Sequence, residues 1–218
     1  AWLKRKPIVL IEQNSVPGIA NRILSPFASK IALGLPLQRN FFQKKKIVST
    51  GLPLRSDFDS RIKRETSFWK GPLKVLVFGG SQGATAINDV VVRTLPLLHT
   101  LRTELKVVHQ TGDRDIEWVS RAYEKECIDC DVKSFLFDIV DKYKWAHFVI
   151  ARSGAVTVAE ITSMGLPALL IPFPESTHGH QEENAKFLSE KEAGISVKQE
   201  NFNPKVLFSI LSKFIKNR

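Results

Sequence analysis

The residues Gly79 to Gly83, with the sequence GGSQG, directly follow an apolar run from Val75 to Phe78. This β-branched and aromatic run predicts a strand that is buried on both faces. The glycines would let the backbone approach a ligand closely, and Ser81 could cap a helix that begins near residue 84. A strand, a glycine turn and a helix N-terminus together present free N–H groups to an anion such as a diphosphate. The segment therefore predicts an anion site, with a simple tight connection as the alternative.

The glycine spacing does not match the common nucleotide motifs. It is not G-x-G-x-x-G, and the lysine of G-x-x-x-x-G-K-[ST] is absent from the segment. An NAD-binding fold would also need an acidic residue about 20 positions after the glycines. The region after Val90 offers none until Glu104, which lies far from a predicted strand end. An NAD-dependent oxidoreductase is therefore the weakest alternative.

Two later segments contain side chains suited to sugar hydroxyls. Arg152-Ser153-Gly154 opens a predicted helix, with Ser153 at the N-cap position and Glu160 about two turns further on. Glu160 either faces a pocket or lies on the solvent side of this helix. Gln181 and Asn184 stand three residues apart on a predicted first helical turn, where two amides could hydrogen-bond adjacent hydroxyls.

Neither the histidines nor the cysteines predict a metal or redox centre. His178 and His180 stand close to these amides, but without a standard ligand spacing. Cys127 and Cys130 form one C-x-x-C pair with no second pair. We expect both to be unpaired thiols in a reducing cytoplasm, and we expect no metal and no cofactor.

These polar segments are positioned by a regular alternation of strand and helix patterns after residue 70. Such an alternation predicts an α/β fold, with a parallel sheet, helices on both faces and ligands at the carboxyl ends of the strands. The predicted strands are 74–78, 105–109, 132–136, 146–151, 167–171 and 195–197, and the predicted helices are 84–98, 114–125, 138–144, 154–164, 180–193 and 204–216.

A smaller unit is predicted before this alternation, with strands at 7–11, 28–33 and 47–50 and a short helix beginning at Ile19. Its first strand has no preceding partner element, so we expect a chain that is truncated at its start. A polar run from Arg55 to Pro72 suggests a linker. We therefore expect two domains, 1–69 and 70–218.

The net positive charge of the chain arises entirely from its first 70 residues. Residues 1–70 hold 14 Lys and Arg against 4 Asp and Glu, whereas the remainder holds 18 of each. Lys44, Lys45 and Lys46 stand beside Phe41 and Phe42, a combination that suits an anionic membrane surface or nucleic acid. A solvated loop is the alternative. A nucleic-acid-binding protein would explain this charge but not the polar segments of the second domain.

In chain order, the segments GGSQGA, RSGAVTVAE, GLPALLIPFP and HQEENA resemble the MurG family. Members of this family transfer N-acetylglucosamine from UDP-N-acetylglucosamine to undecaprenyl-diphospho-N-acetylmuramoyl pentapeptide (lipid I to lipid II) in peptidoglycan synthesis. The similarity extends to EQNSVPGIANRIL and GLPLR and so covers nearly the whole chain. The resemblance implies two Rossmann-like domains of the GT-B type, of which the N-terminal acceptor domain is incomplete here. It also implies a peripheral protein at the cytoplasmic face of the bacterial inner membrane, with no nucleic-acid partner.

The resemblance also implies roles for individual residues. Ser81 and Gln82 would contact the diphosphate, Arg55 and the backbone of Leu136 the uridine, and Glu160 the ribose. Gln181 and Asn184 would bind the N-acetylglucosamine hydroxyls, and Asn14 would approach from the other domain. The remaining residues expected at the substrate site are Arg152, Ser153 and His180.

An inverting displacement needs a general base for the acceptor hydroxyl. Where the family usually has His before Glu-Gln-Asn, this chain has Ile11, which leaves Glu12 as the ionisable candidate on that strand. We expect the main base to lie in the absent N-terminal half, and the chain by itself to bind donor without turnover. The alternative is the donor-binding module of a two-chain N-acetylglucosaminyltransferase, which is inactive alone.

Overall fold

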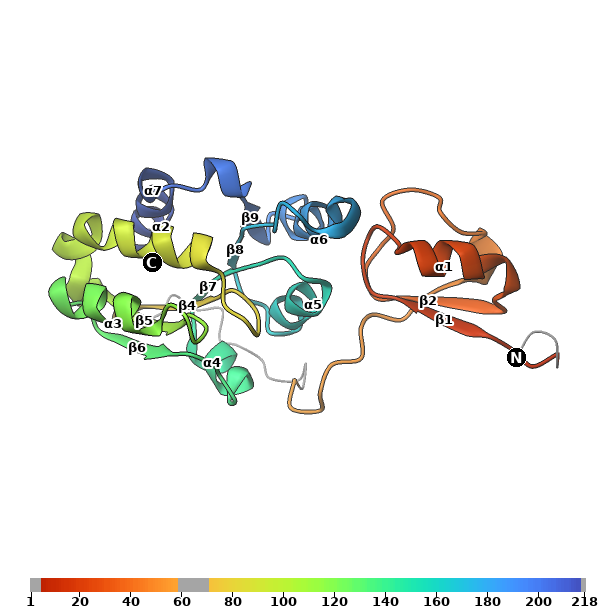
Figure 1. Ribbon diagram of the computed structural model, residues 1–218, viewed down its shortest axis with the longest axis horizontal. Coiled ribbons are helices and arrows are strands. Elements are labelled where there is room, and N and C mark those ends of the chain that lie inside the picture. Colours follow the sequence, from red (N-terminus) through yellow and green to blue (C-terminus); the bar gives the residue numbers. More distant parts are fainter. Residues whose placement is uncertain (1–4, 59–70, 217–218) are drawn as a thin grey trace.

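The computed structural model describes residues 5–58 and 71–216. Within these ranges the strands form two sheets, and every pair of neighbouring strands is parallel. The smaller sheet has the order β1-β2-β3 and lies with helix α1 at one end of the molecule (Figure 1). Its elements are β1 (Val9–Glu12), α1 (Ile19–Leu24), β2 (Lys30–Leu33) and β3 (Ile47–Ser49).

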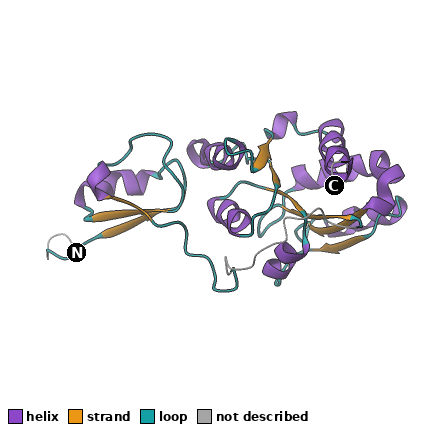
Figure 2. Cartoon of the chain, turned by 180° about the vertical axis from the view of Figure 1, so that it is seen from behind, coloured by secondary structure: helices purple, strands orange, loops and turns teal. Residues whose placement is uncertain are grey.

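The larger sheet has the strand order β6-β5-β4-β7-β8-β9 in the described residues. Helices lie on both of its faces, which the view from behind also shows (Figure 2). Its strands are β4 (Leu73–Phe78), β5 (Leu105–Gln110), β6 (Cys130–Lys133), β7 (Phe148–Ala151), β8 (Ala168–Leu170) and β9 (Gly194–Ser196). Its α-helices are α2 (Thr85–Leu98), α3 (Ile116–Lys125), α4 (Ile139–Trp145), α5 (Ala155–Ser163), α6 (His180–Ser189) and α7 (Pro204–Lys216).

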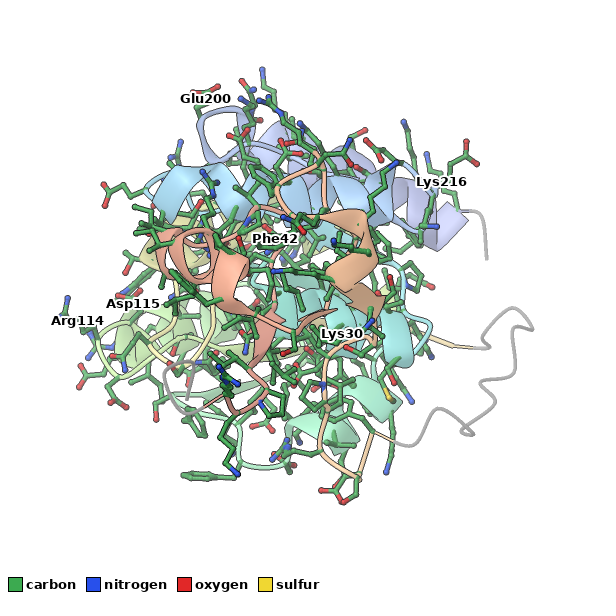
Figure 3. All side chains as sticks on the ribbon, turned by 90° about the vertical axis from the view of Figure 1, so that its right-hand side faces the viewer. Lys30, Phe42, Arg114, Asp115, Glu200 and Lys216 are labelled. Atoms are coloured by element: carbon green, nitrogen blue, oxygen red, sulfur yellow. The ribbon has the colours of Figure 1, made fainter. Side chains whose placement is uncertain are left out.

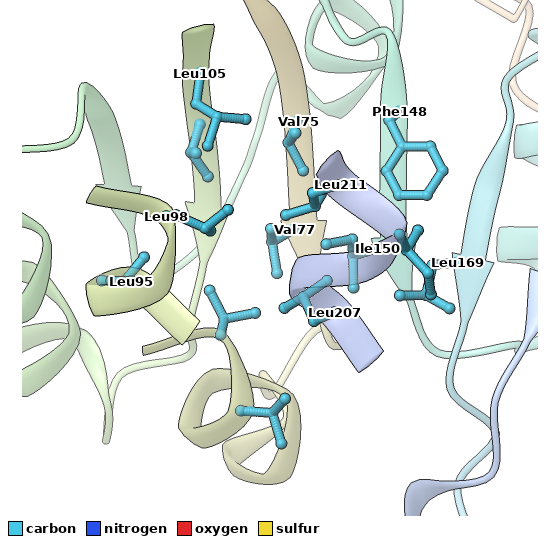
Figure 4. Close-up of a cluster of buried hydrophobic side chains, with 14 of the residues drawn as sticks. Val75, Val77, Leu95, Leu98, Leu105, Phe148, Ile150, Leu169, Leu207 and Leu211 are labelled. Atoms are coloured by element: carbon cyan, nitrogen blue, oxygen red, sulfur yellow. The ribbon is translucent and has the colours of Figure 1, made fainter. Parts of the chain in front are cut away.

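The two faces of the sheet have separate cores because successive strand residues point to opposite sides. On β4, Val75 and Val77 pack with α2, α3 and α7, whereas Leu76 and Phe78 pack with α4 and α5. Figure 4 shows the first of these cores, with Val75 and Val77 beside side chains of α2 and α7. At roughly 1.5–3 kcal/mol for each fully buried large apolar side chain, these cores hold the strand ends in place.

The predicted α/β class is confirmed. Two elements end three or four residues before their predicted bounds, and the other bounds differ from the prediction by two residues or fewer. The strand predicted at 132–136 spans Cys130–Lys133, and the Ser134 carbonyl that follows it accepts from Gly112 N–H and from the Gln110 amide. The helix predicted at 180–193 ends at Ser189, and Ala193 N–H closes the turn on the Leu188 carbonyl.

The predicted boundary between residues 69 and 70 lies outside the described residues. The segment before it packs on the larger unit. Leu35 and Phe58 belong to the core formed with α4 and α5, and the Phe58 ring lies edge-on to Tyr143, with 5.7 Å between the centroids. The two predicted domains are therefore in apolar contact. In the described part of the chain, no helix is long and apolar enough to cross a membrane.

Candidate functional site

A cleft of about 550 Å³ opens at the carboxyl edge of the larger sheet. The strand order changes direction between β4 and β7, which are paired, and such a switch point is the usual ligand site of open α/β sheets. Several segments far apart in the sequence meet here: Gly79, Gly80, Gly83, Ala84, Thr85, Ala86, Arg152, Gly154, Thr157, Phe173, Gln181 and Gln199 line the cleft.

The glycine loop is packed against the backbone that follows β5. Gly83 has a φ of +76°, and a Cβ there would collide with the Thr111 carbonyl. Gly112 has a φ of +80°, and a Cβ there would collide with the Gln82 carbonyl. Glycine is required at both positions because two backbones touch with no room for side chains. Ser81 and Gln82 are exposed on this loop.

Two helices begin at the cleft without a side-chain cap. The N-cap residues are Ala84 for α2 and Gly154 for α5, and no described side chain caps either helix. The prediction that Ser81 and Ser153 cap these helices is therefore wrong. The Ser153 hydroxyl instead donates to the Gln181 carbonyl at 2.8 Å, which ties the start of α5 to α6. Uncapped first turns leave N–H groups and two positive dipole ends for an anion in the cleft.

Arg152 holds two walls of the cleft together. Its guanidinium donates to the carbonyls of Ile171 and Pro172, both at 3.2 Å, and to Gln199 Oε1 at 2.6 Å. It also lies over the Phe173 ring, 5.3 Å from the centroid. Burial lowers the pKa of Arg152, but guanidinium stays charged in proteins. The side chain therefore contributes a fixed positive charge to the cleft.

The first turn of α6 presents an amide to the cleft. Gln181 Oε1 accepts from Phe173 N–H at 3.0 Å, so the described contacts leave its Nε2 as a donor to a hydroxyl. His180 Nδ1 lies 2.6 Å from the Thr177 carbonyl. Because a carbonyl only accepts, Nδ1 carries the proton and Nε2 is the basic nitrogen of a neutral His180.

Glu160 lies on α5 beside a second group of residues predicted for the nucleoside. Its Oε2 accepts from the Tyr143 hydroxyl at 3.0 Å. Burial raises the pKa of Glu160, while the Tyr143 hydrogen bond and the charge of Arg55 act in the opposite direction. Leu136 is buried in the same core as Tyr143. The structure thus brings Arg55, Leu136 and Glu160 to one region around Tyr143.

Asn184 connects the two units directly. It is fully buried, and its Oδ1 accepts from Ser15 N–H at 3.0 Å. Its Nδ2 donates to Asn14 Oδ1 at 3.1 Å and to the Ser153 carbonyl at 3.2 Å. Both amide groups of Asn184 are therefore used between the units, and the sugar contacts predicted for Asn14 and Asn184 stay predictions.

Glu12 is buried, with 3% of its surface exposed, at the end of β1. Its Oε1 accepts from Asn14 N–H at 3.0 Å, and its Oε2 accepts from Gly18 N–H at 3.2 Å and from Asn21 Nδ2 at 2.8 Å. A carboxylate with these contacts holds the loop that carries Asn14. Its role as a base stays a prediction, and these contacts favour a positioning role.

The cleft includes residues that the sequence did not single out. Thr157 lies one helical turn after Ser153, so the helix prediction could have indicated it. Gln199 comes from a short 3₁₀ turn (Gln199–Asn201) far along the chain and carries no sequence signal. No group of His, Cys, Asp or Glu within the described ranges has the arrangement of a metal site, and Cys127 and Cys130 are free thiols.

Comparison with known proteins identifies the family. The model of the glycosyltransferase family 28 C-terminal domain matches residues 74–218. The chain belongs to glycosyltransferase family 28. The match covers both uncapped helices, Glu160 and Gln181.

Two curated relatives are similar to this chain over nearly all of its own length. A Coxiella burnetii (strain RSA 331 / Henzerling II) protein is 37% identical over 220 residues, covering 100% of this chain and 61% of the relative. A Thermodesulfovibrio yellowstonii protein is 35% identical, covering 99% of this chain and 60% of the relative. Both are named UDP-N-acetylglucosamine-N-acetylmuramyl-(pentapeptide) pyrophosphoryl-undecaprenol N-acetylglucosamine transferase. The chain thus spans less than two thirds of their length.

The crystal structure of Acinetobacter baumannii MurG is similar to this chain with a TM-score of 0.80 and 30% identity. The similarity covers 99% of this chain and 62% of that one. The resemblance to the MurG family and the fold of the GT-B type are thereby confirmed.

Replacing Asn184 by alanine should lower the free energy of unfolding by roughly 2–4 kcal/mol, because Ser15 N–H and the Ser153 carbonyl lose a buried partner. Urea unfolding measures the change. The control is Asn201→Ala, at an exposed position. Equal stability of the two variants would show that the amide contributes nothing between the units.

Replacing Glu160 by glutamine should stabilise the protein relative to wild type at neutral pH and have no such effect below about pH 4. The folded carboxyl has a pKa above its ordinary 4.5, so it binds its proton more tightly than the unfolded one. Ionisation therefore destabilises the fold as pH rises through that window. Glutamine does not ionise and still accepts from Tyr143. Urea unfolding at pH 4 and pH 7 tests this, and a less stable variant at pH 7 would contradict it.

Proposed function

We propose that this chain binds UDP-N-acetylglucosamine and belongs to an inverting transferase that moves N-acetylglucosamine to lipid-linked N-acetylmuramoyl pentapeptide in peptidoglycan synthesis. The observation that carries the proposal is the pair of uncapped helix N-termini, of α2 and α5, in one cleft. The names of the relatives from Coxiella burnetii and Thermodesulfovibrio yellowstonii support the choice of donor and acceptor.

A diphosphate matches the charge and donors of this cleft. The first turns of α2 and α5 supply N–H groups, and Arg152 supplies a fixed positive charge. In a direct displacement at the anomeric carbon, negative charge builds on the departing diphosphate. Preformed N–H donors stabilise that charge without reorganising, and in many enzymes such stabilisation accounts for most of the rate enhancement.

The two ends of the donor match the side chains on either side of these helices. The Gln181 amide, at the cleft, would donate to an N-acetylglucosamine hydroxyl. Glu160 would accept from the ribose hydroxyls, and the raised pKa of this carboxyl would fall once two donors contact it. Ser81 and Gln82 would contact the diphosphate from the exposed tip of the loop. None of the described residues is assigned as the general base.

Replacing Glu160 by alanine should weaken UDP-N-acetylglucosamine binding about tenfold to a hundredfold, since hydrogen bonds to a charged group contribute roughly 1.5–3 kcal/mol. Calorimetric titration measures the dissociation constant, and titrations with UDP-glucose and with NAD give the values for comparison. Glu124→Ala removes an exposed carboxylate of α3 and serves as the control. An unchanged dissociation constant for Glu160→Ala would remove this residue from the site.

We further propose that the N-terminal unit docks on the anionic cytoplasmic face of the inner membrane, where a lipid-linked acceptor would lie. Two residues of the predicted membrane segment, Phe42 and Lys46, make contacts within the unit. Phe42 is buried in the core of the small unit, so it does not reach a membrane. Lys46 Nζ donates to the carbonyls of Ser25 and Pro26 and so is engaged within the unit.

Those Lys46 bonds place the basic turn beside an exposed apolar patch formed by Ile23, Leu24 and Phe27, which are 64%, 47% and 45% exposed. Lys44 and Lys45 remain exposed on the turn. Lys30, labelled in Figure 3, is exposed on the neighbouring strand, and its Nζ donates to the Lys45 carbonyl. Apolar side chains rimmed by lysines are typical of interfacial binding.

Replacing both Lys44 and Lys45 by glutamine should reduce binding to anionic vesicles roughly tenfold to thirtyfold at low salt, because each lysine near the surface contributes about 1 kcal/mol. Cosedimentation measures the binding, which should also weaken as salt rises. Lys125→Gln combined with Lys205→Gln makes the same charge change on exposed positions of the larger unit. Equal loss in both double variants, or equal binding to neutral vesicles, would exclude this patch.

A further inference from the structure

A buried polar network lies next to the glycine loop, and none of its side chains lines the cleft. Asn88 of α2, His109 of β5 and Asp115 ahead of α3 are 1%, 0% and 6% exposed. His109 Nε2 lies 3.0 Å from Asn88 Oδ1, and its Nδ1 lies 3.2 Å from the Tyr123 hydroxyl. Asn88 Nδ2 donates to Asp115 Oδ2 at 2.8 Å and to the Thr111 carbonyl at 2.9 Å. The proposed donor contacts use none of these side chains.

The hydrogen-bonding pattern leaves one arrangement of protons. Both N–H bonds of the Asn88 amide are directed at acceptors, so its Oδ1 must accept from His109 Nε2–H. His109 Nδ1 is then an acceptor, and Tyr123 must donate to it. Burial lowers the pKa of His109 to about 3, so the ring is neutral at physiological pH. His109 therefore carries no charge in this network. The charged member is the Asp115 carboxylate: burial acts to raise its pKa, but hydrogen bonds from Thr85, Trp118 and Asn88 lower it overall. Asn88 acts on the loop through the positions that its hydrogen bonds fix.

Asn88 connects this network to the phosphate-binding backbone at two points. Its own N–H donates to the Ala84 carbonyl, at the end of the glycine loop and the start of α2. Its side chain fixes the Thr111 carbonyl, the atom that Gly83 approaches too closely for any side chain to fit between them. Thr111 and Gly112 are also tied to the end of β6, through the carbonyls of Lys133 and Ser134. The glycine loop thus packs against the Thr111 backbone, whose carbonyl accepts a hydrogen bond from the Asn88 side chain.

We infer that Asn88, held by His109 and Asp115, is a positioning residue for the diphosphate. It would act by fixing the surface against which Gln82 and Gly83 pack, so that the loop N–H groups meet the phosphate oxygens without rearrangement. A site held this way loses affinity when its supporting residues are removed, even though they touch no ligand. The inference rests on the proposed function, since it assumes that the diphosphate lies at this loop.

The test compares ligands with and without the diphosphate. Calorimetric titration of the full chain with UDP and with uridine separates the phosphate contribution from that of the nucleoside. Asn88→Ala should weaken UDP binding about tenfold and leave uridine binding unchanged. Thr94→Val is the matched control, because Thr94 is a fully buried polar residue of the same helix whose hydroxyl donates only to the Val90 carbonyl among the described contacts.

Two substitutions of His109 repeat the test without touching Asn88. Glutamine keeps a donor for Asn88 Oδ1 and should retain UDP affinity within about threefold, whereas leucine removes the donor and should behave like Asn88→Ala. If Asn88→Ala fails to fold, the difference between His109→Gln and His109→Leu decides the question.

The possible results separate the two proposals. Wild-type protein that binds neither UDP nor uridine would overturn the donor site and this role with it. Wild-type protein that binds UDP, with Asn88→Ala and His109→Leu either unchanged or equally weakened toward UDP and uridine, would overturn the positioning role alone. Selective loss of UDP binding in these variants, with Thr94→Val unaffected, would support it.

Discussion

The N–H groups in the first turns of α2 and α5 need hydrogen-bond partners, and this need is the constraint on which the cleft depends. The first turn of any helix has N–H groups without intrahelical partners, and these need a cap, water or a ligand. Here α2 and α5 begin without a side-chain cap in the described chain, and both line the same cleft. They meet because β4 and β7 are paired and parallel, so the helices that follow them, on opposite faces of the sheet, both start at its carboxyl edge. Sheet topology thus concentrates two positive dipole ends at one place.

The residues around this cleft work mainly by holding backbone in place. Ser153 ties α5 to α6, and Arg152 ties the loop after β8 to Gln199. Gly83 and Gly112 allow two loops to touch without side chains between them. Each of these contacts keeps donors fixed before a ligand arrives, which reduces the free energy lost to ordering on binding.

Contact between the two units uses both an apolar and a polar interaction. Leu35 and Phe58 join a core of the larger unit, and Asn184 makes hydrogen bonds to Ser15 and Asn14. A buried amide costs free energy unless its donors and acceptor are all matched, so these bonds specify one relative placement better than apolar packing does. The loop that Glu12 organises is the part of the small unit that reaches this amide.

The sequence by itself determined the alternation of strands and helices, because hydrophobic periodicity and glycine turns are local features. It also singled out the glycine loop and Gln181, which line the cleft, and Glu160, which is half-buried on α5. Tertiary structure alone decided that Ser153 tethers α6 instead of capping α5, and that Asn184 spans the two units. It also decided that Gln199 reaches Arg152 and that Phe42 is buried. The partners of these side chains lie far away in the sequence, and a side chain that could make a local bond takes whichever partner the packed fold brings within reach.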